Sequence, residues 1–212
     1  VGTTGRNDIT VVALFSAKLL NTGTSYMKMW MPASSDVSYF TALAPSAKTA
    51  SSPYQSKPSL VVTMRKEKPA VEEPFVVVYE PISDKLSTGL IESVDRIKLD
   101  SLGKKGCAIK VKTKEGDTFT LVNILKDGPV ILNNQKCCGD FAIFAKRKGK
   151  NSVYVGNGSF VENKEFKVES ENRGSFYMEY DQTSLLVRSN CPIKIQAKNG
   201  MLKEPFYLTG GE

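Results

Sequence analysis

The sequence predicts an all-β protein, an antiparallel β-sandwich with a smaller C-terminal β-sheet subdomain. Three observations lead to this prediction. Apolar and polar residues alternate with a period of two along most of the chain, turn signals separate the alternating runs, and no segment has a helical apolar stripe over three turns. The chain has 212 residues, of which 41% are hydrophobic, so a sizeable core is possible. We expect helix in fewer than about a tenth of the residues.

The individual strands follow from this alternation and from the turns between them. Glycine-containing turns are expected over 115–117, 148–151, 157–158 and 199–200. Residues 75–79 are apolar on both faces and lie between Pro74 and Pro81, which is typical of a central strand covered from both sides. Residues 45–58 are expected to form a long surface loop, and 67–73 a polar loop. Strands with one apolar face are expected over 8–16, 26–32, 107–114, 118–124, 141–147, 152–155, 165–169, 176–180 and 193–198.

The strands become shorter and more hairpin-like near residues 148–158, which suggests two units. We expect a β-sandwich over residues 1–147 and a small antiparallel β subdomain over 148–212. The chain begins with Val1 and has no leader segment, which suggests a trimmed or mature fragment without a signal peptide. No apolar run is long enough to cross a membrane, so no membrane span is expected.

The charge balance is basic, with 29 Lys and Arg against 22 Asp and Glu and a net charge of +7. Such a charge can attract nucleic acid, acidic glycans or membranes. The lysines are spread along the chain, however, which also fits ordinary solvated strand faces. No RNA-binding, zinc-finger or helix-turn-helix pattern is present, so we expect no nucleic-acid partner.

The chain contains no His, which excludes Ser-His-Asp and Cys-His catalysis and imidazole metal ligands. The four cysteines have no CxxC spacing and are expected to be buried free thiols, with no metal site and no cofactor. Carboxylate pairs such as Glu72 and Glu73 leave a glycosidase possible, although that reaction needs two carboxylates across one cleft. We expect no catalytic residue in this chain. The cysteines are Cys107, Cys137, Cys138 and Cys191.

Several residues are candidates for contact with a sugar. Trp30 shares a strand face with Tyr26 and Lys28, so it can belong to a stacking platform or to the core. The basic run at 146–148 can bind sulfate or uronate groups or can be a solvated turn. A designed site would stack Trp30 or Tyr54 on a ring while an arginine pairs with a carboxylate or sulfate. The candidate carbohydrate-binding residues are Trp30, Tyr54, Arg65, Lys146, Arg147 and Lys148.

Several short segments follow one another in a recognisable order and spacing. They are 27–32, 40–45, 52–54, 58–62, 74–81, which contains Val76–Pro81 (VVVYEP), and 91–94. Their order and spacing resemble the C-terminal half of heparinase II/III-like polysaccharide lyases over about residues 25–125. Residues beyond about 148 are not covered by the resemblance.

The resemblance implies a larger protein with an N-terminal α/α-toroid followed by β-sandwich layers, located in the periplasm or outside the cell. Such lyases cleave acidic polysaccharides by β-elimination, with a Tyr or His base that lies largely outside the region matched here. This chain would then be a non-catalytic part that supports the toroid, whereas the alternative is an independent carbohydrate-binding or adhesin-type module. An exposed apolar face would favour the first, and an exposed aromatic platform the second.

Overall fold

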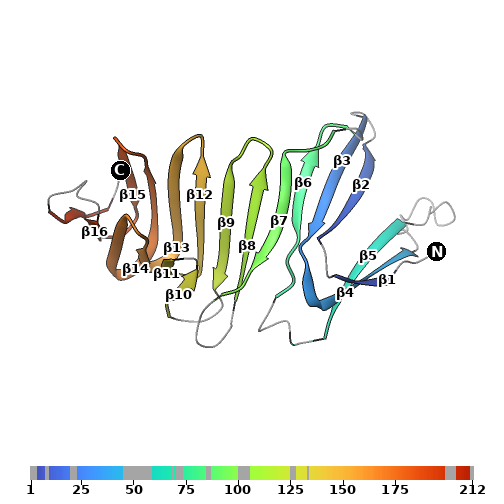
Figure 1. Ribbon diagram of the computed structural model, residues 1–212, viewed down its shortest axis with the longest axis horizontal. Helices are drawn as coiled ribbons and strands as arrows, with labels where there is room; N and C mark the ends of the chain where they lie inside the picture. The colour runs from blue at the N-terminus through green and yellow to red at the C-terminus, as the bar shows by residue number, and fades with distance from the viewer. Residues whose placement is uncertain are drawn as a thin grey trace, which may run out of the picture.

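The protein is all-β, as predicted. The structure is a computed structural model that describes residues 4–7, 10–19, 23–44, 59–67, 69, 74–84, 87–99, 106–124, 128–132, 134–198 and 204–210. None of these residues lies in a helix, and all strand pairs among them are antiparallel. Figure 1 shows the strands side by side in a row, with the two ends of the chain at opposite ends of the molecule.

The strands are β1 (Thr4–Asn7), β2 (Val11–Leu19), β3 (Gly23–Met31), β4 (Ser34–Ala44), β5 (Ser59–Lys66), β6 (Val78–Ile82), β7 (Ile91–Ile97), β8 (Gly106–Thr113), β9 (Thr118–Ile124), β10 (Val130–Leu132), β11 (Gln135–Cys138), β12 (Phe141–Arg147), β13 (Lys150–Glu162), β14 (Phe166–Tyr180), β15 (Leu185–Ser189), β16 (Ile193–Ala197) and β17 (Phe206–Leu208).

In the described part of the chain these strands form three sheets. Two small sheets have the orders β1–β4–β5 and β2–β3–β6. The third runs β17–β16–β14–β13–β12–β9–β8–β7, with β10, β11 and β15 attached at its sides. Most neighbours in the large sheet also follow one another in sequence, so hairpin turns set much of its order.

The long hairpin of β13 and β14 turns the large sheet into two layers. The first half of β13 pairs with β12 and its second half with β11, and the register shifts between these halves. Glycines permit the close backbone approach at this bend, because a Cβ on Gly158 would lie 2.4 Å from the carbonyl oxygen of Cys138. Asn157 has a positive φ of 46° there, as in a β-bulge.

Both halves of this hairpin contribute to one core, so the hairpin folds over it. We call the two layers built by β9–β17 the C-terminal sandwich. In each strand the buried residues alternate with residues on the opposite face, as a half-buried strand requires. The hairpin's core residues are Val153, Val155, Val161, Phe166, Val168, Phe176, Met178 and Tyr180.

A second core lies on the opposite face of the large sheet, where Trp30 packs with Val94, Ile109 and Val111. The buried carboxylate of Glu80 connects the strands around this core. It accepts hydrogen bonds from the indole nitrogen of Trp30 at 3.0 Å and from the backbone nitrogen of Ile91 at 2.8 Å. Glu80 therefore ties β3 and β6 to β7.

The prediction of a central strand over 75–79 is wrong. Residues 74–77 are not in a strand, and β6 lies at the end of the sheet order β2–β3–β6. Phe75 and Tyr79 are 44% and 61% exposed, so the run is not covered on both faces. Pro81 lies inside β6, where an edge position tolerates its missing N–H donor. A short apolar run does not by itself distinguish a central strand from an edge strand.

The predicted turns have mixed outcomes. The hairpins around Gly116 and Gly149 are confirmed, the second with a turn of only two residues, Lys148 and Gly149, both at positive φ. The turn predicted at 157–158 is wrong, because these residues form the bend inside β13. The loops predicted at 45–58 and, for the most part, 67–73 lie outside the described residues. The boundary at residues 147 and 148 stays a prediction, and β12 pairs with β13 across it.

Candidate carbohydrate-binding site

A row of polar side chains crosses one end of the C-terminal sandwich and the adjoining strand β8. Consecutive members are cross-strand partners, so their side chains are direct neighbours on one face. Five strands at the usual spacing of about 4.8 Å make this row about 19 Å long. We call it the polar row, and its members are Lys112, Thr118, Lys146, Asn151 and Tyr180.

The alternation of each strand explains why the row lies where the core ends. Phe144 and Val153 lie on the same face, two residues away from Lys146 in β12 and from Asn151 in β13, and they are 5% and 4% exposed. The side chains of Lys146 and Asn151 therefore share the core face but lie beyond the apolar packing, at the open mouth of the sandwich. Lys110 adds a third lysine on this face, opposite Thr120.

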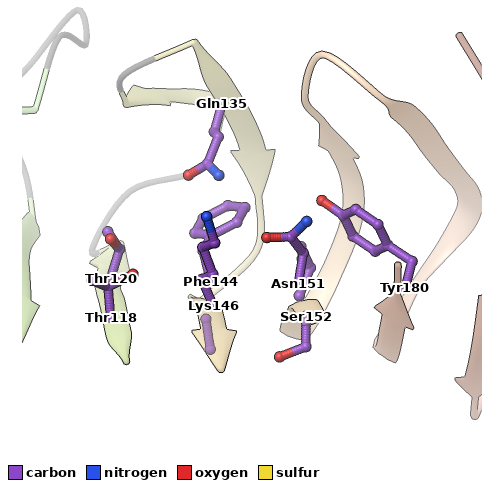
Figure 2. Close-up of a pocket in the computed structure, with 10 residues that line it drawn as sticks. Thr118, Thr120, Gln135, Phe144, Lys146, Asn151, Ser152 and Tyr180 are labelled. Carbon is purple, nitrogen blue, oxygen red and sulfur yellow. The ribbon is translucent and has the colours of Figure 1, made fainter. Parts of the chain in front are cut away.

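The mouth contains two adjacent hollows with volumes of about 120 and about 240 Å³. Gln135, Asn151 and Tyr180 line both, so the hollows are continuous along the row. Figure 2 shows the polar ends of Gln135, Lys146 and Asn151 gathered around the same space, with the Tyr180 hydroxyl turned toward Asn151. The hollow is thus lined by amide, hydroxyl and ammonium groups.

Most of these groups are free to bind a ligand. Within the described residues, the side chains of Lys112, Thr118, Lys146, Asn151 and Gln135 form no hydrogen bond or ion pair. Amides both donate and accept hydrogen bonds, hydroxyls do the same, and lysine supplies three charged donors. The site can therefore bind anionic groups and hydroxyl groups together.

Tyr180 is the fixed element of the site and is 6% exposed. The side-chain nitrogen of Asn163 donates a hydrogen bond to its hydroxyl at 3.0 Å, and the Phe166 ring meets it edge-on at 4.6 Å. Burial raises the pKa of Tyr180, and the hydrogen bond to Glu165 raises it further. The phenol therefore stays protonated at neutral pH, which suits a structural group and not a general base.

The structure separates most of the predicted sugar-binding residues. Trp30 in β3 is 9% exposed, and its indole N–H is bonded to Glu80, which favours the core role over the stacking role. Arg65 is exposed on β5, in a different sheet from Trp30. Tyr54 lies outside the described residues. The structure does not bring these residues together, so a shared site for them stays an untested expectation.

The basic run at the β12–β13 hairpin divides between two environments. Lys146 belongs to the polar row. Arg147 lies on the opposite face, where its Nε is 3.6 Å from the Oδ2 of Asp117 and its guanidinium is 5.9 Å from the Phe119 ring centroid. The backbone nitrogen of Lys148 donates a hydrogen bond to the other oxygen of Asp117 at 3.2 Å. Asp117 thus holds the turn in place beside the β8–β9 hairpin.

The sequence alone did not point to the neutral members of the site, which are Thr118, Asn151, Gln135 and Tyr180. A partial signal was available, because the predicted turn at 115–117 already makes 107–114 and 118–124 hairpin partners. That turn would pair Lys112 with Thr120, however, whereas the actual turn over 114–116 pairs Lys112 with Thr118. A four-residue turn at 148–151, as predicted, would have included Asn151 in the turn, whereas the actual two-residue turn pairs it with Lys146.

No metal site is apparent in the described part of the chain, where no three or more His, Cys, Asp or Glu side chains are grouped to hold an ion. The cysteines are free thiols, of which Cys137 and Cys191 are buried and Cys107 and Cys138 are half-buried. Burial raises the pKa of Cys137 to about 12. The described residues also contain no long apolar helix of the kind that spans a membrane.

A second surface lies on the opposite side of the same strands. It carries apolar and aromatic side chains, with the charged Glu179 and Arg188 among them, and Leu121, Phe141 and Leu186 are 36%, 41% and 43% exposed. The Phe141 and Tyr154 rings are 5.5 Å apart. We call this surface the outer face, and its members are Leu121, Phe141, Ile143, Tyr154, Tyr177, Glu179, Leu186 and Arg188.

Comparison with known proteins finds similarity to an enzyme that acts on a polysaccharide. The chain is 28% identical over 158 residues to an endo-acting ulvan lyase of Formosa agariphila, in a match that covers 72% of this chain. The match spans 19% of that lyase, so the chain corresponds to about a fifth of its relative's length. No family model and no solved structure matches the chain. The chain is therefore similar to one part of a much longer polysaccharide lyase.

Proposed function

We propose that this chain is a non-catalytic β region of a heparinase II/III-like polysaccharide lyase that acts on acidic polysaccharides by β-elimination. The similarity to one fifth of an ulvan lyase is the observation that carries the proposal. The segment order described above is the reason for the narrower assignment to the heparinase II/III-like family. The parent protein would work in the periplasm or outside the cell, where polysaccharide substrates are found.

Two features of the chain support a non-catalytic role. β-Elimination needs a base near the uronate carbon, and the pKa of an efficient base lies near the working pH. The chain has no His, and burial keeps Tyr180, the tyrosine of the polar hollow, protonated. The outer face supports a role beside a catalytic α/α-toroid, because exposed apolar patches of this kind commonly mark interaction surfaces.

The test is a product assay with ulvan, heparin and alginate, which follows the absorbance of unsaturated uronate. We expect no product from this chain alone and product from the longer parent polypeptide assayed in parallel. Product formed by the chain alone and lost in Tyr180→Phe would contradict the proposal, because the active site would then lie within these residues.

The second candidate function is an independent carbohydrate-binding module, and the polar row is the observation that favours it. The two functions differ in what the rest of the parent protein needs. A supporting region is required for the parent's folding, so its deletion should abolish soluble expression and all activity. A binding module is dispensable for folding, and its deletion should lower the affinity for long polysaccharide and leave activity on short oligosaccharides unchanged.

A further inference from the structure

We propose that the mouth of the C-terminal sandwich binds one strand of an anionic oligosaccharide laid along the polar row. The inference rests on the proposed function for its ligand class and adds the site. The row combines lysines at the rim with amides and hydroxyls in the hollow. Its ligand is thus a sugar chain that carries carboxylate or sulfate groups.

The lysines set the spacing of the anionic groups. Lys112 and Lys146 lie on either side of Thr118 and are two strands apart, which is about 10 Å at the usual strand spacing. They can therefore contact anionic groups on two different sugar units of one chain. Both side chains are exposed and have no ion-pair partner within the described residues, so a ligand does not have to displace a protein carboxylate.

The hollow supplies contacts to the sugar hydroxyls between these charges. Asn151 and Gln135 provide amides, and Thr118 and Thr120 provide hydroxyls, along the same lining. Such groups match sugar hydroxyls, which also donate and accept. Tyr180 lines both hollows and is held by the hydrogen bond from Asn163, so this part of the lining is in place before a ligand binds.

The burial of the aromatic residues favours a sugar over a single-stranded nucleic acid. Nucleic-acid sites of this kind stack bases on exposed rings along a basic groove. The rings that line the hollow, Phe144 and Tyr180, are 5% and 6% exposed and present no open face. The row can therefore pair charges and hydroxyls but cannot stack bases.

The experiment is calorimetric titration of the chain with a heparin oligosaccharide, an alginate oligosaccharide and a neutral glucan, at low and at physiological salt. We expect binding of the anionic sugars and none of the neutral one. Alginate carries carboxylates without sulfates, so comparison with heparin identifies the anionic group. The double variant K112A/K146A should lose at least about tenfold in affinity, about 1.4 kcal/mol, and N151A should lose affinity for oligosaccharides but not for free sulfate.

The matched control is K98A/K194A, which removes the same charge from outside the row. It should bind within about twofold of the unmodified chain, and all variants should keep its melting temperature. Equal losses in the two double variants would overturn the proposal, since binding would then reflect net charge alone. Row-dependent binding of a DNA oligonucleotide with equal affinity, or no binding of either anionic sugar, would also overturn it. None of these outcomes depends on the product assay, so the two proposals fail independently.

Discussion

At the scale of single residues, a buried ion pair joins β4 to β5. The ammonium group of Lys66 lies 2.9 Å from a carboxylate oxygen of Asp36, and the two side chains are 2% and 6% exposed. Burial acts to raise the pKa of Asp36, but the hydrogen bonds from Ser34 and Lys66 outweigh it, and the pKa is lowered below its usual 3.8. The charged carboxylate is therefore the form that the fold stabilises.

This pair makes stability sensitive to acid. Because the folded-state pKa of Asp36 is depressed, its contribution is fully present above the unfolded value of about 3.9 and is lost as pH falls through the lower folded value. We expect the free energy of unfolding to fall more steeply with decreasing pH in the unmodified chain than in Asp36→Asn. The difference should appear between pH 5 and pH 3, about one unit on either side of the unfolded-state pKa. Urea unfolding followed by Trp30 fluorescence measures both slopes. Identical slopes would show that the pair does not contribute.

At the scale of elements, the Glu80 carboxylate connects strands from two sheets. It accepts hydrogen bonds from Trp30, Leu90 and Ile91, and a Cβ on the neighbouring Gly89 would lie within 2.7 Å of its carboxyl atoms. Gly89 has a φ of 73°, so this close approach requires a glycine on both grounds. The junction is therefore specified by the carboxylate and by the turn that wraps it.

Removing this carboxylate should loosen the junction. Glu80→Ala leaves the buried indole N–H of Trp30 and two half-buried backbone N–H groups without their acceptor, at about 1–3 kcal/mol each, so we expect a loss of about 3 kcal/mol in the free energy of unfolding. Trp30 is the single tryptophan of the chain, and its fluorescence emission should shift to longer wavelength as water reaches it. Glu92→Ala, at an exposed position of β7, serves as the control and should change neither property. An unshifted emission in Glu80→Ala would mean that packing alone holds Trp30.

At the scale of the whole molecule, the large sheet has one face in a core and another that is open over much of its area. Two phenylalanines of β12 distinguish these faces, since Phe144 is 5% exposed in the main core and Phe141 is 41% exposed on the outer face. Phe144→Ala should cost about 3–5 kcal/mol of stability. Phe141→Ala should cost about 1 kcal/mol or less, as at other exposed positions.

Urea unfolding of both variants checks this contrast in the isolated chain. Equal losses would mean that the outer face is also part of a core. The same pair bears on the proposed support of a toroid, because a domain covering the outer face should make Phe141→Ala more destabilising in the longer parent polypeptide than in this chain. If the effect of Phe141→Ala is the same in both, the outer face is not the surface that the toroid contacts.

The all-β class followed from sequence because period-two alternation is a local property of each strand. The turn around Gly116 also predicted the β8–β9 hairpin, although its exact register differs, since the actual turn over 114–116 pairs Lys112 with Thr118 and the predicted turn over 115–117 would pair Lys112 with Thr120. Alternation further separated Lys110 and Lys112 from Ile109 and Val111, which the structure places on opposite faces of β8. These features depend on residues close together in the chain.

The composition of the candidate site depended on contacts between distant strands. The pairing of β9 with β12 and the bend in the β13–β14 hairpin bring Thr118, Asn151 and Tyr180 together at the mouth of the C-terminal sandwich. Neither the strand pairing nor the bend can be predicted from a local sequence pattern. The burial of Trp30 could not be predicted from local sequence for the same reason, since residues that lie far away in the sequence cover its strand face. Alternation reveals that a strand has two different faces, but only the global packing decides which face is covered and where the covering ends.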